Sequence, residues 1–267
     1  MYRYETHLHT SPVSKCARAT VRETLEFYSS QGYDGVFLTN HFINGNMEKR
    51  EGASYEDMIN FFFSDYEAAL AISEEIGIKV FSGVEMACGG NHFLVYGLDK
   101  EWYLAHPDIL SMNFSTMLQF MREEGAFVSH AHPFDERPFI DHIKLMPRCV
   151  DAVEVVNVGK TSFQNSMANF YADAYGLLKT AGSDNHDAGR GNKFAGIECE
   201  EPIESISDFI AKAKVGKLSL FRRERESADA AFSDVASSLT ASYNQSRKHK
   251  ADAPHRVYPS GASVIFT

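Results

Sequence analysis

The sequence predicts an α/β fold in which helices cover a mostly parallel β-sheet. Two observations support this prediction. Short apolar, β-branched or aromatic runs alternate with longer stretches of helical period, which is typical of repeated strand–helix units. The length of 267 residues lies within the range of one large domain, and an α/β barrel commonly reaches this size without dividing.

Seven runs are predicted strands because they are short, apolar and rich in β-branched or aromatic residues. They are the segments 2–8, 35–40, 78–86, 92–98, 126–132, 152–158 and 177–184. Helices are predicted at 21–32, 55–77, 166–176 and 206–216. Thr20 and Ser54 are suitable N-caps for the first two helices, and Gly32 and Gly77 are suitable C-terminal stops.

The character of the sequence changes near residue 217. From there to the end, charged residues, Ser and Ala are mixed with little sustained period. We therefore expect one domain over residues 1–216, followed by a C-terminal extension over residues 217–267. This extension is either a terminal helix with coil or a partly ordered tail, and no chemistry is assigned to it.

Composition excludes several classes of protein. The formal net charge of −10 argues against a general nucleic-acid-binding or anionic-membrane surface, because both need clustered Lys and Arg. An anionic substrate is compatible with this charge only where a local cation such as a metal reverses the field. The four cysteines form no CxxC pair, and no apolar run has the length of a membrane span. A cytoplasmic protein with reduced thiols is expected.

Ionisable residues gather at or just beyond the C-terminal ends of the predicted strands. In a parallel barrel these ends converge on one rim, where barrel active sites are built. Histidine and carboxylate ligands without paired cysteines suit zinc, manganese or iron. The ligands are too many for one tetrahedral site. Two ions bridged by a carboxylate suit in-line displacement at phosphorus, since such ions lower the pKa of an attacking water.

Five motifs in order, "HLHT", "TNH", "SGVE", "HAHP" and "GSDNH", resemble the motif series of the PHP (polymerase and histidinol phosphatase) family of metal-dependent phosphoesterases. The resemblance covers roughly the first three quarters of the chain. It implies a distorted (β/α)7 barrel, with two or three divalent ions (Mn, Zn or Fe) at the C-terminal rim of the strands. The metal ligands that it implies are His7, His9, His41, Glu85 as the bridging carboxylate, His92, His132, Asp184 and His186.

Two departures from the family pattern concern the metal site. Asn40 stands where relatives often have Asp; it can orient His41 by a hydrogen bond but carries no charge. In the loop after the first motif, where many relatives have an Asp, Cys16 is the only conventional ligand type. A third metal site is therefore either altered or absent.

Other polar residues are candidates for contacts with the substrate. His130 lies two residues before His132 on the same predicted strand, so we expect it to share that face as a general acid or as a partner of a ligand. Glu154 and Asn157 are candidates for supporting a ligand or binding substrate. Arg190, in a glycine-rich loop, is the first candidate to bind a phosphate oxygen.

The remaining cations and histidines carry less information. Arg18, Arg137 and Lys160 are further cations in predicted rim loops. Four histidines that match no motif are expected at the surface: His106, His142, His249 and His255.

The predicted function is metal-dependent hydrolysis of a phosphoester. The expected substrate is a phosphomonoester of a small metabolite or nucleotide, with histidinol phosphate as one candidate. Three alternatives stay open: a phosphodiesterase or exonuclease acting on oligonucleotides, a protein tyrosine phosphatase, and a metal-binding scaffold without activity. The last alternative is motivated by Asn40 and by the missing loop Asp.

Overall fold

The computed structural model describes residues 1–138, 140, 142–188 and 192–224. The part of the expected C-terminal extension from residue 225 onward lies outside these residues. None of the helices in the described ranges is long and apolar enough to cross a membrane.

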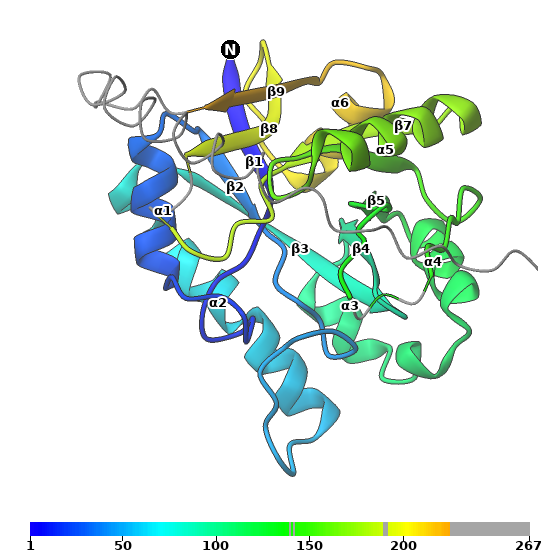
Figure 1. Ribbon diagram of the computed structural model, residues 1–267. Coiled ribbons are helices and arrows are strands. Elements are labelled where there is room, and N and C mark those ends of the chain that lie inside the picture. Colours follow the sequence, from blue (N-terminus) through cyan, green and yellow to red (C-terminus); the bar gives the residue numbers. More distant parts are fainter. Residues whose placement is uncertain (139, 141, 189–191, 225–267) are drawn as a thin grey trace, which may run out of the picture. The chain divides into compact units, whose positions relative to one another are not determined.

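One mixed sheet organises the described residues (Figure 1). Its strands are β1 (Tyr2–Leu8), β2 (Gly35–Leu38), β3 (Lys79–Cys88), β4 (Asn91–Tyr96), β5 (Phe127–Ala131), β6 (Ala152–Asn157), β7 (Leu178–Gly182), β8 (Lys193–Cys199) and β9 (Ser219–Glu224). They are ordered β7-β6-β5-β4-β3-β2-β1-β8-β9. All seven predicted strands are present, whereas β8 and β9 are additional, so the strand count of an ideal (β/α)7 barrel is not reproduced.

The prediction of a mostly parallel sheet is wrong. β1–β2, β2–β3, β5–β6 and β6–β7 are parallel, but β1–β8, β3–β4, β4–β5 and β8–β9 are antiparallel. The reversal at β3–β4 is caused by a two-residue hairpin turn, in which Gly89 and Gly90 both have positive φ and Cys88 pairs with Asn91. Because of this hairpin, β4 starts at the rim where its neighbours end.

The sheet is nearly closed into a barrel, because the two halves of β1 have different neighbours. Its first half pairs with β8, and its second half reaches the end of β7. There the Thr6 hydroxyl donates to the Ala181 carbonyl (2.7 Å), and the Asp184 amide donates to the His7 carbonyl (2.8 Å). A Cβ atom on Gly182 would lie 2.5 Å from the His7 Cβ atom, so this approach requires glycine.

Six helices surround the sheet in the described ranges: α1 (Val21–Ser30), α2 (Tyr55–Ile76), α3 (Lys100–Ala105), α4 (Phe114–Glu123), α5 (Ser162–Tyr175) and α6 (Ile206–Lys214). A 3-10 turn, η1 (Ile109–Ser111), separates α3 from α4. Thr20 and Ser54 are N-caps with complete capping boxes, as predicted, and Gly77 ends α2 in the left-handed conformation. The helices α3 and α4 are not predicted from the sequence.

The expected domain boundary at residue 216 differs from the structure. Ser219–Glu224 form β9, which pairs antiparallel with β8 along its whole length. Phe221 of this strand packs against Tyr33 with ring centroids 5.6 Å apart. These six residues therefore belong to the sheet and not to the extension.

Aromatic side chains fill the barrel below the rim. Phe37 stacks on Phe81 (ring centroids 4.8 Å apart), and Tyr96 and Phe209 pack against Phe37. Phe209 comes from α6, which covers the end of the barrel opposite the rim that carries the polar motifs. A dry aromatic interior therefore supports that rim from below.

Candidate metal centre

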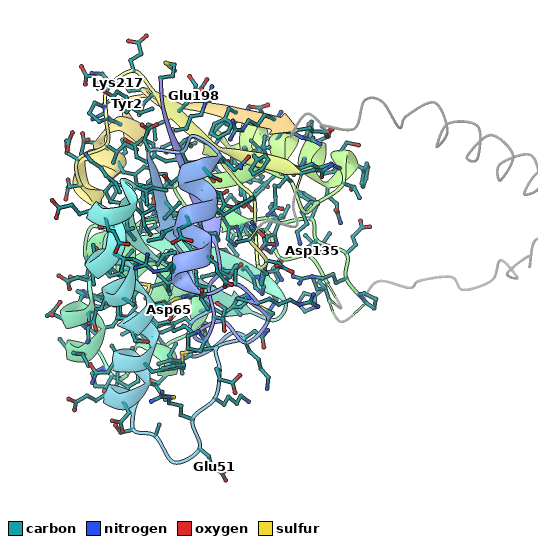
Figure 2. The ribbon with its side chains drawn as sticks, turned by 90° about the vertical axis from the view of Figure 1, so that its left-hand side faces the viewer. Tyr2, Glu51, Asp65, Asp135, Glu198 and Lys217 are labelled. Atoms are coloured by element: carbon teal, nitrogen blue, oxygen red, sulfur yellow. The ribbon has the colours of Figure 1, made fainter. Side chains whose placement is uncertain are left out.

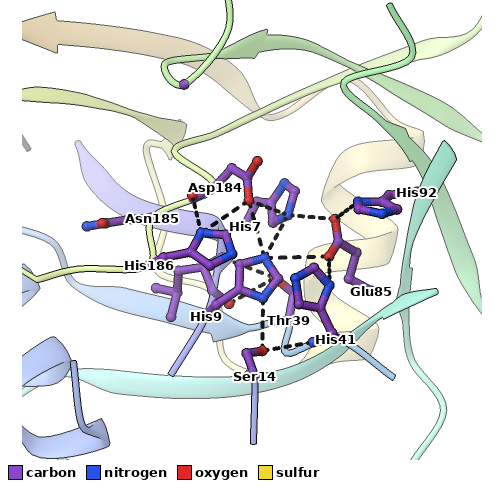
Figure 3. A network of polar contacts seen from close by, with 12 residues as sticks. His7, His9, Ser14, Thr39, His41, Glu85, His92, Asp184, Asn185 and His186 are labelled. Carbon is purple, nitrogen blue, oxygen red and sulfur yellow. Dashed lines mark hydrogen bonds and ion pairs between the residues drawn. The ribbon is translucent and has the colours of Figure 1, made fainter. Parts of the chain in front are cut away.

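The eight side chains that the PHP resemblance implies as ligands lie together at one end of the barrel. Figure 3 labels all of them except His132. His7, Glu85 and His92 belong to β1, β3 and β4, and the other five follow β1, β2, β5 and β7. They form four overlapping groups of three whose ligand atoms lie within 4.8 Å of one another. These groups are His9–His41–His186, His7–Glu85–His132, His7–His9–Asp184 and His41–Glu85–His92.

Glu85 is the central carboxylate of this cluster. It is fully buried, and its Oε1 atom lies 2.8 Å from His92 Nδ1, 3.2 Å from His7 Nε2 and 3.5 Å from His132 Nε2. Its Oε2 atom contacts His41 Nδ1 and lies 3.6 Å from His9 Nε2. Both oxygens thus face imidazole nitrogens on different sides, which is the arrangement that a bridging carboxylate needs.

Asp184 provides a second carboxylate from the loop after β7. Its Oδ1 atom lies 3.3 Å from His9 Nε2 and 3.5 Å from His7 Nε2, and its Oδ2 atom lies 3.7 Å from His132 Nε2. Asp184 (φ 53°) and His132 (φ 28°) are the two non-glycine residues with positive φ in the described ranges. Strained backbone of this kind costs about 1–3 kcal/mol per residue and concentrates at functional sites.

The antiparallel direction of β4 explains how His92 joins the cluster. His92 lies near the start of its strand, opposite Ala87 of β3 and Ala131 of β5. Because β4 runs against both neighbours, its beginning lies at the rim where β3 and β5 end. A rule based on strand C-terminal ends therefore does not reach this residue.

Three histidines have one ring nitrogen fixed by a polar partner. His7 Nδ1 lies 2.9 Å from Glu154 Oε1, His9 Nδ1 lies 3.1 Å from Ser14 Oγ, and His186 Nδ1 lies 2.8 Å from the Asp184 carbonyl. The carboxylate and the carbonyl are acceptors, so they place the proton of His7 and His186 on Nδ1. The lone pair of Nε2 is then free for a metal ion.

Glu154 also connects the loop after β5 and the end of β6 to the cluster. Its Oε2 atom accepts hydrogen bonds from the His132 amide (3.1 Å) and from Asn157 Nδ2 (2.9 Å). Glu154 and Asn157 are fully buried. The strand-end pair Glu154 and Asn157 therefore supports His7 and His132 from behind.

A second buried network, which contains a residue missed from the sequence, supports His9. Ser14 Oγ accepts from the His41 amide (3.0 Å) and donates to Asn40 Oδ1 (2.8 Å). Asn40 Nδ2 in turn donates to Asp65 Oδ2 (3.1 Å) on α2. Asp65 is a carboxylate on the buried stripe of a long apolar helix, and this was the signal that could have identified it.

The donor set and the orphaned atoms fit divalent cations. Both oxygens of Glu85, His41 Nδ1, His92 Nδ1 and His132 Nε2 are buried without a hydrogen-bond partner among the described residues. Lone pairs that face one another at such distances repel unless a cation lies between them. Mixed imidazole and carboxylate donors suit zinc, manganese or iron.

The pKa values of the cluster residues also fit a site for cations. Burial would raise the pKa of Glu85, but His92 and His41 hold it well below its usual value. Burial would likewise raise the pKa of Asp184, and His7 is the main group that keeps it well below. Burial opposes a proton on His7, yet Glu154 and Asp184 raise its pKa well above the usual value. Glu85 and Asp184 are therefore held in the ionised form that can bind a cation.

The expectation that His130 shares the face of His132 is wrong. His132 lies past the end of β5 with positive φ, so the alternation of a strand does not extend to it. His130 is fully buried, stacks on Phe93 (ring centroids 4.4 Å apart) and packs edge-on against Tyr171. Burial lowers its pKa to about 3. This placement does not support a role as a general acid.

Cys16 lies beside two of the cluster histidines. Its thiol is within hydrogen-bonding reach of His186 and His41, and these two groups outweigh burial and lower the pKa of Cys16 to about 6. The loop that carries it is tied to the rim by the Arg18 amide, which donates to the His186 carbonyl (2.7 Å). The cysteine thus occupies the neighbourhood of the His9–His41–His186 group.

Three further sequence candidates in the described ranges, His106, His142 and Arg18, do not contribute a side chain to the cluster. His106 stacks on Trp102, outside the cluster, and His142 is exposed. The Arg18 side chain is largely exposed beside Asp187. Arg190, His249 and His255 lie outside the described residues.

Solved structures share this fold. A two-domain protein from Bacteroides vulgatus, containing a predicted PHP-like metal-dependent phosphoesterase, superposes with a TM-score of 0.60 at 16% identity, over 82% of this chain and 64% of that one. The present chain thus spans less than two thirds of the length of that protein. PsfC from Pseudomonas syringae superposes with a TM-score of 0.52 at 16% identity, over 92% of this chain and 100% of PsfC.

These structures define the class of fold, which is the PHP-type barrel. The motif resemblance to PHP phosphoesterases is thereby confirmed at the level of the fold. A histidinol phosphate phosphatase from Lactococcus lactis, complexed with zinc, L-histidinol and phosphate, has a TM-score of only 0.39 at 11% identity, over 80% of this chain and 93% of that one. No protein-family model and no curated protein matches the sequence.

Proposed function

We propose that this protein is a metal-dependent hydrolase of a small phosphomonoester. The observation that carries the proposal is the environment of Glu85, whose two oxygens face five imidazoles and have no hydrogen-bond donor among the described residues. Such a carboxylate is suited to bridge two cations. The fold of a PHP-like phosphoesterase supports the same reading.

The four groups of ligand atoms indicate which residues would hold the ions. Glu85 belongs to two groups, one with His7 and His132 and one with His41 and His92. Asp184 completes a group with His7 and His9, and His186 a group with His9 and His41. Two or three ions of zinc, manganese or iron fit these shared ligands. When bound, such ions polarise phosphoryl oxygens and lower the pKa of a water for in-line attack.

The chain's own residues orient the ligands and leave space for a substrate. Glu154 and Ser14 fix the rings of His7 and His9, so the ligands are positioned before substrate arrives. A hollow of about 370 Å³ lies beside Asp184 and His186 and is also lined by Val158, Gly159 and Phe194. This size suits the leaving group of a small metabolite or nucleotide.

The supporting network weakens the alternative of an inactive scaffold. That alternative was motivated by the uncharged Asn40 and by the missing loop Asp. Asp65 supplies a buried carboxylate one hydrogen bond beyond Asn40 in the same network. Buried supports on both sides of Glu85 favour an active site over a scaffold, although the loop after β1 still lacks an Asp.

The proposal is tested by metal content and turnover together. Protein purified without chelator should contain two or three ions by mass spectrometry, and should hydrolyse p-nitrophenyl phosphate with added manganese, zinc or iron. Glu85→Ala and Asp184→Ala should lose both metal and turnover, whereas His106→Ala is the matched control and should keep both. Wild-type turnover in Glu85→Ala, or a wild-type protein that binds no metal, would overturn the proposal.

A further inference from the structure

Lys160 is placed directly beside the cluster. It lies in the loop between β6 and α5, immediately before Thr161, the N-cap of α5. Its side chain is only 11% exposed, and its Nζ atom lies 2.9 Å from Asp135 Oδ2 and 3.6 Å from Asp184 Oδ2. Among the ion pairs between described residues, this contact is the one that joins a Lys or Arg to a member of the cluster.

The loop that carries Lys160 is tied to the residues that support the cluster. The Lys160 amide donates to the Asn157 carbonyl (3.2 Å), and the Gly159 amide donates to Asn157 Oδ1 (2.9 Å). Asn157 Nδ2 donates to Glu154 Oε2, whose other oxygen faces His7. These hydrogen bonds therefore fix the loop of Lys160 relative to Glu154 and His7.

Asp135 positions the Lys160 ammonium group but does not use all of its hydrogen-bond donors. This carboxylate, in the loop after β5 (Figure 2), is only 6% exposed and uses the same oxygen for Lys160 and for Arg137 Nε (2.6 Å). An ammonium group has three N–H donors. Asp135 Oδ2 accepts one of them, and Asp184 lies only at ion-pair distance, so donors of this group remain for a ligand at the rim.

We propose that Lys160 binds a non-bridging oxygen of the substrate and thereby selects phosphomonoester dianions over phosphodiesters. The inference rests on the proposed function. A monoester carries a second negative charge near neutral pH, since its second pKa is about 6, whereas a diester carries one charge. Once Asp184 is engaged by a metal ion, the buried ammonium group lies where it can pair with that additional charge.

The Lys160→Gln variant removes the charge and keeps a polar side chain. We expect kcat/KM for p-nitrophenyl phosphate to fall about 10- to 100-fold, as for loss of one charged donor to a reacting phosphate. For bis(p-nitrophenyl) phosphate, kcat/KM should change less than about threefold, and metal content should not change. Lys160→Arg should recover part of the monoester activity. Lys179→Gln is the matched control, because Lys179 pairs with Asp173 away from the cluster.

A second measurement separates this inference from the proposed function. Inorganic phosphate is titrated into metal-loaded wild-type and Lys160→Gln protein by calorimetry, which needs no turnover. Weaker phosphate binding by Lys160→Gln supports the role of Lys160 even if neither ester is hydrolysed. Equal phosphate binding, or an equal loss of activity toward both esters, would show that Lys160 only holds Asp135 in place.

Discussion

The two histidines of the first motif are supported in different ways. His7 Nδ1 contacts a buried carboxylate directly, Glu154, at 2.9 Å. His9 Nδ1 contacts a neutral hydroxyl, Ser14 Oγ, and the nearest carboxylate of that network, Asp65, is reached only through Asn40. The His7 ring is therefore hydrogen-bonded directly to a charged group. The His9 ring is connected to a charged group only through the neutral side chains of Ser14 and Asn40, which we call the relay.

This difference predicts two unequal metal positions. A carboxylate behind a ligating imidazole fixes its tautomer and makes it a stronger electron donor, whereas a hydroxyl mainly fixes its orientation. The metal-free pKa values have the same asymmetry: Glu154 and Asp184 outweigh burial and raise the pKa of His7, while burial and the nearby His41 and His186 lower that of His9. We infer that an ion held by His7 binds more tightly than one held on the side of His9, His41 and His186.

Among the changes that test this comparison, Glu154→Gln should have the largest effect. If the Gln amide faces His7 Nδ1, the ring must carry its proton on Nε2 and loses the lone pair that a metal needs. If the amide faces the other way, it opposes the donors of His132 and Asn157. We expect metal affinity to fall about 10- to 100-fold, with a parallel loss of turnover, measured by competition with a chelator.

Glu67→Gln is the control for this variant, because Glu67 pairs with Lys100 at an exposed position far from the rim. Unchanged metal retention in Glu154→Gln would show that the direct carboxylate is not what distinguishes the two histidines.

A smaller and more local effect is expected from Ser14→Ala. The change leaves His9 Nδ1 and the His41 amide without their buried partner, at a cost of about 1–3 kcal/mol in the free energy of unfolding. One ion should be lost on dialysis while the ions held through His7 remain. Metal stoichiometry and thermal unfolding report the two effects, with Ser64→Ala on α2 as the control. Loss of all ions at once would argue against two separable positions.

Periodicity and motif order predicted the parts of the molecule that depend on local sequence. The seven strands and the caps at Thr20 and Ser54 follow from short-range patterns, and the ligand motifs lie at strand ends because βα units place them there. The direction of β4 was not predicted, since it depends on the tight turn at Gly89 and Gly90 between two predicted strands.

The supports of the cluster could not be predicted in the same way. Asp65 reaches Asn40 from a helix 25 residues further along the chain, and no local pattern encodes that contact. His130 was misplaced for the opposite reason: a local rule, alternation along a strand, was extended one residue past the strand, where His132 adopts positive φ. Packing between distant elements, and strain at a single residue, both override local patterns.

The smallest expected effect comes from adding a carboxylate at position 40, next to Asp65. Asn40→Asp places a second carboxylate about 3 Å from Asp65, and both positions are buried, so the pair must share a proton. Burial already raises the pKa of Asp65. A folded-state pKa above the unfolded value costs no stability at low pH and an increasing amount as pH rises. Metal-free Asn40→Asp should therefore lose more thermal stability, relative to wild type, at about pH 8 than at about pH 5.5.

The double variant Asn40→Asp with Asp65→Asn sharpens the comparison, because it keeps one charge and moves it one hydrogen bond closer to Ser14 and His9. Its pH dependence should return to that of wild type. Its affinity on the His9 side should rise only a few-fold, because the hydroxyl of Ser14 still separates the charge from the ring. Asp65→Asn alone shows what the distant charge contributes. If the stability that Asn40→Asp loses relative to wild type is no greater at about pH 8 than at about pH 5.5, the two carboxylates do not share the buried contact. The relay behind His9 then ends at Ser14.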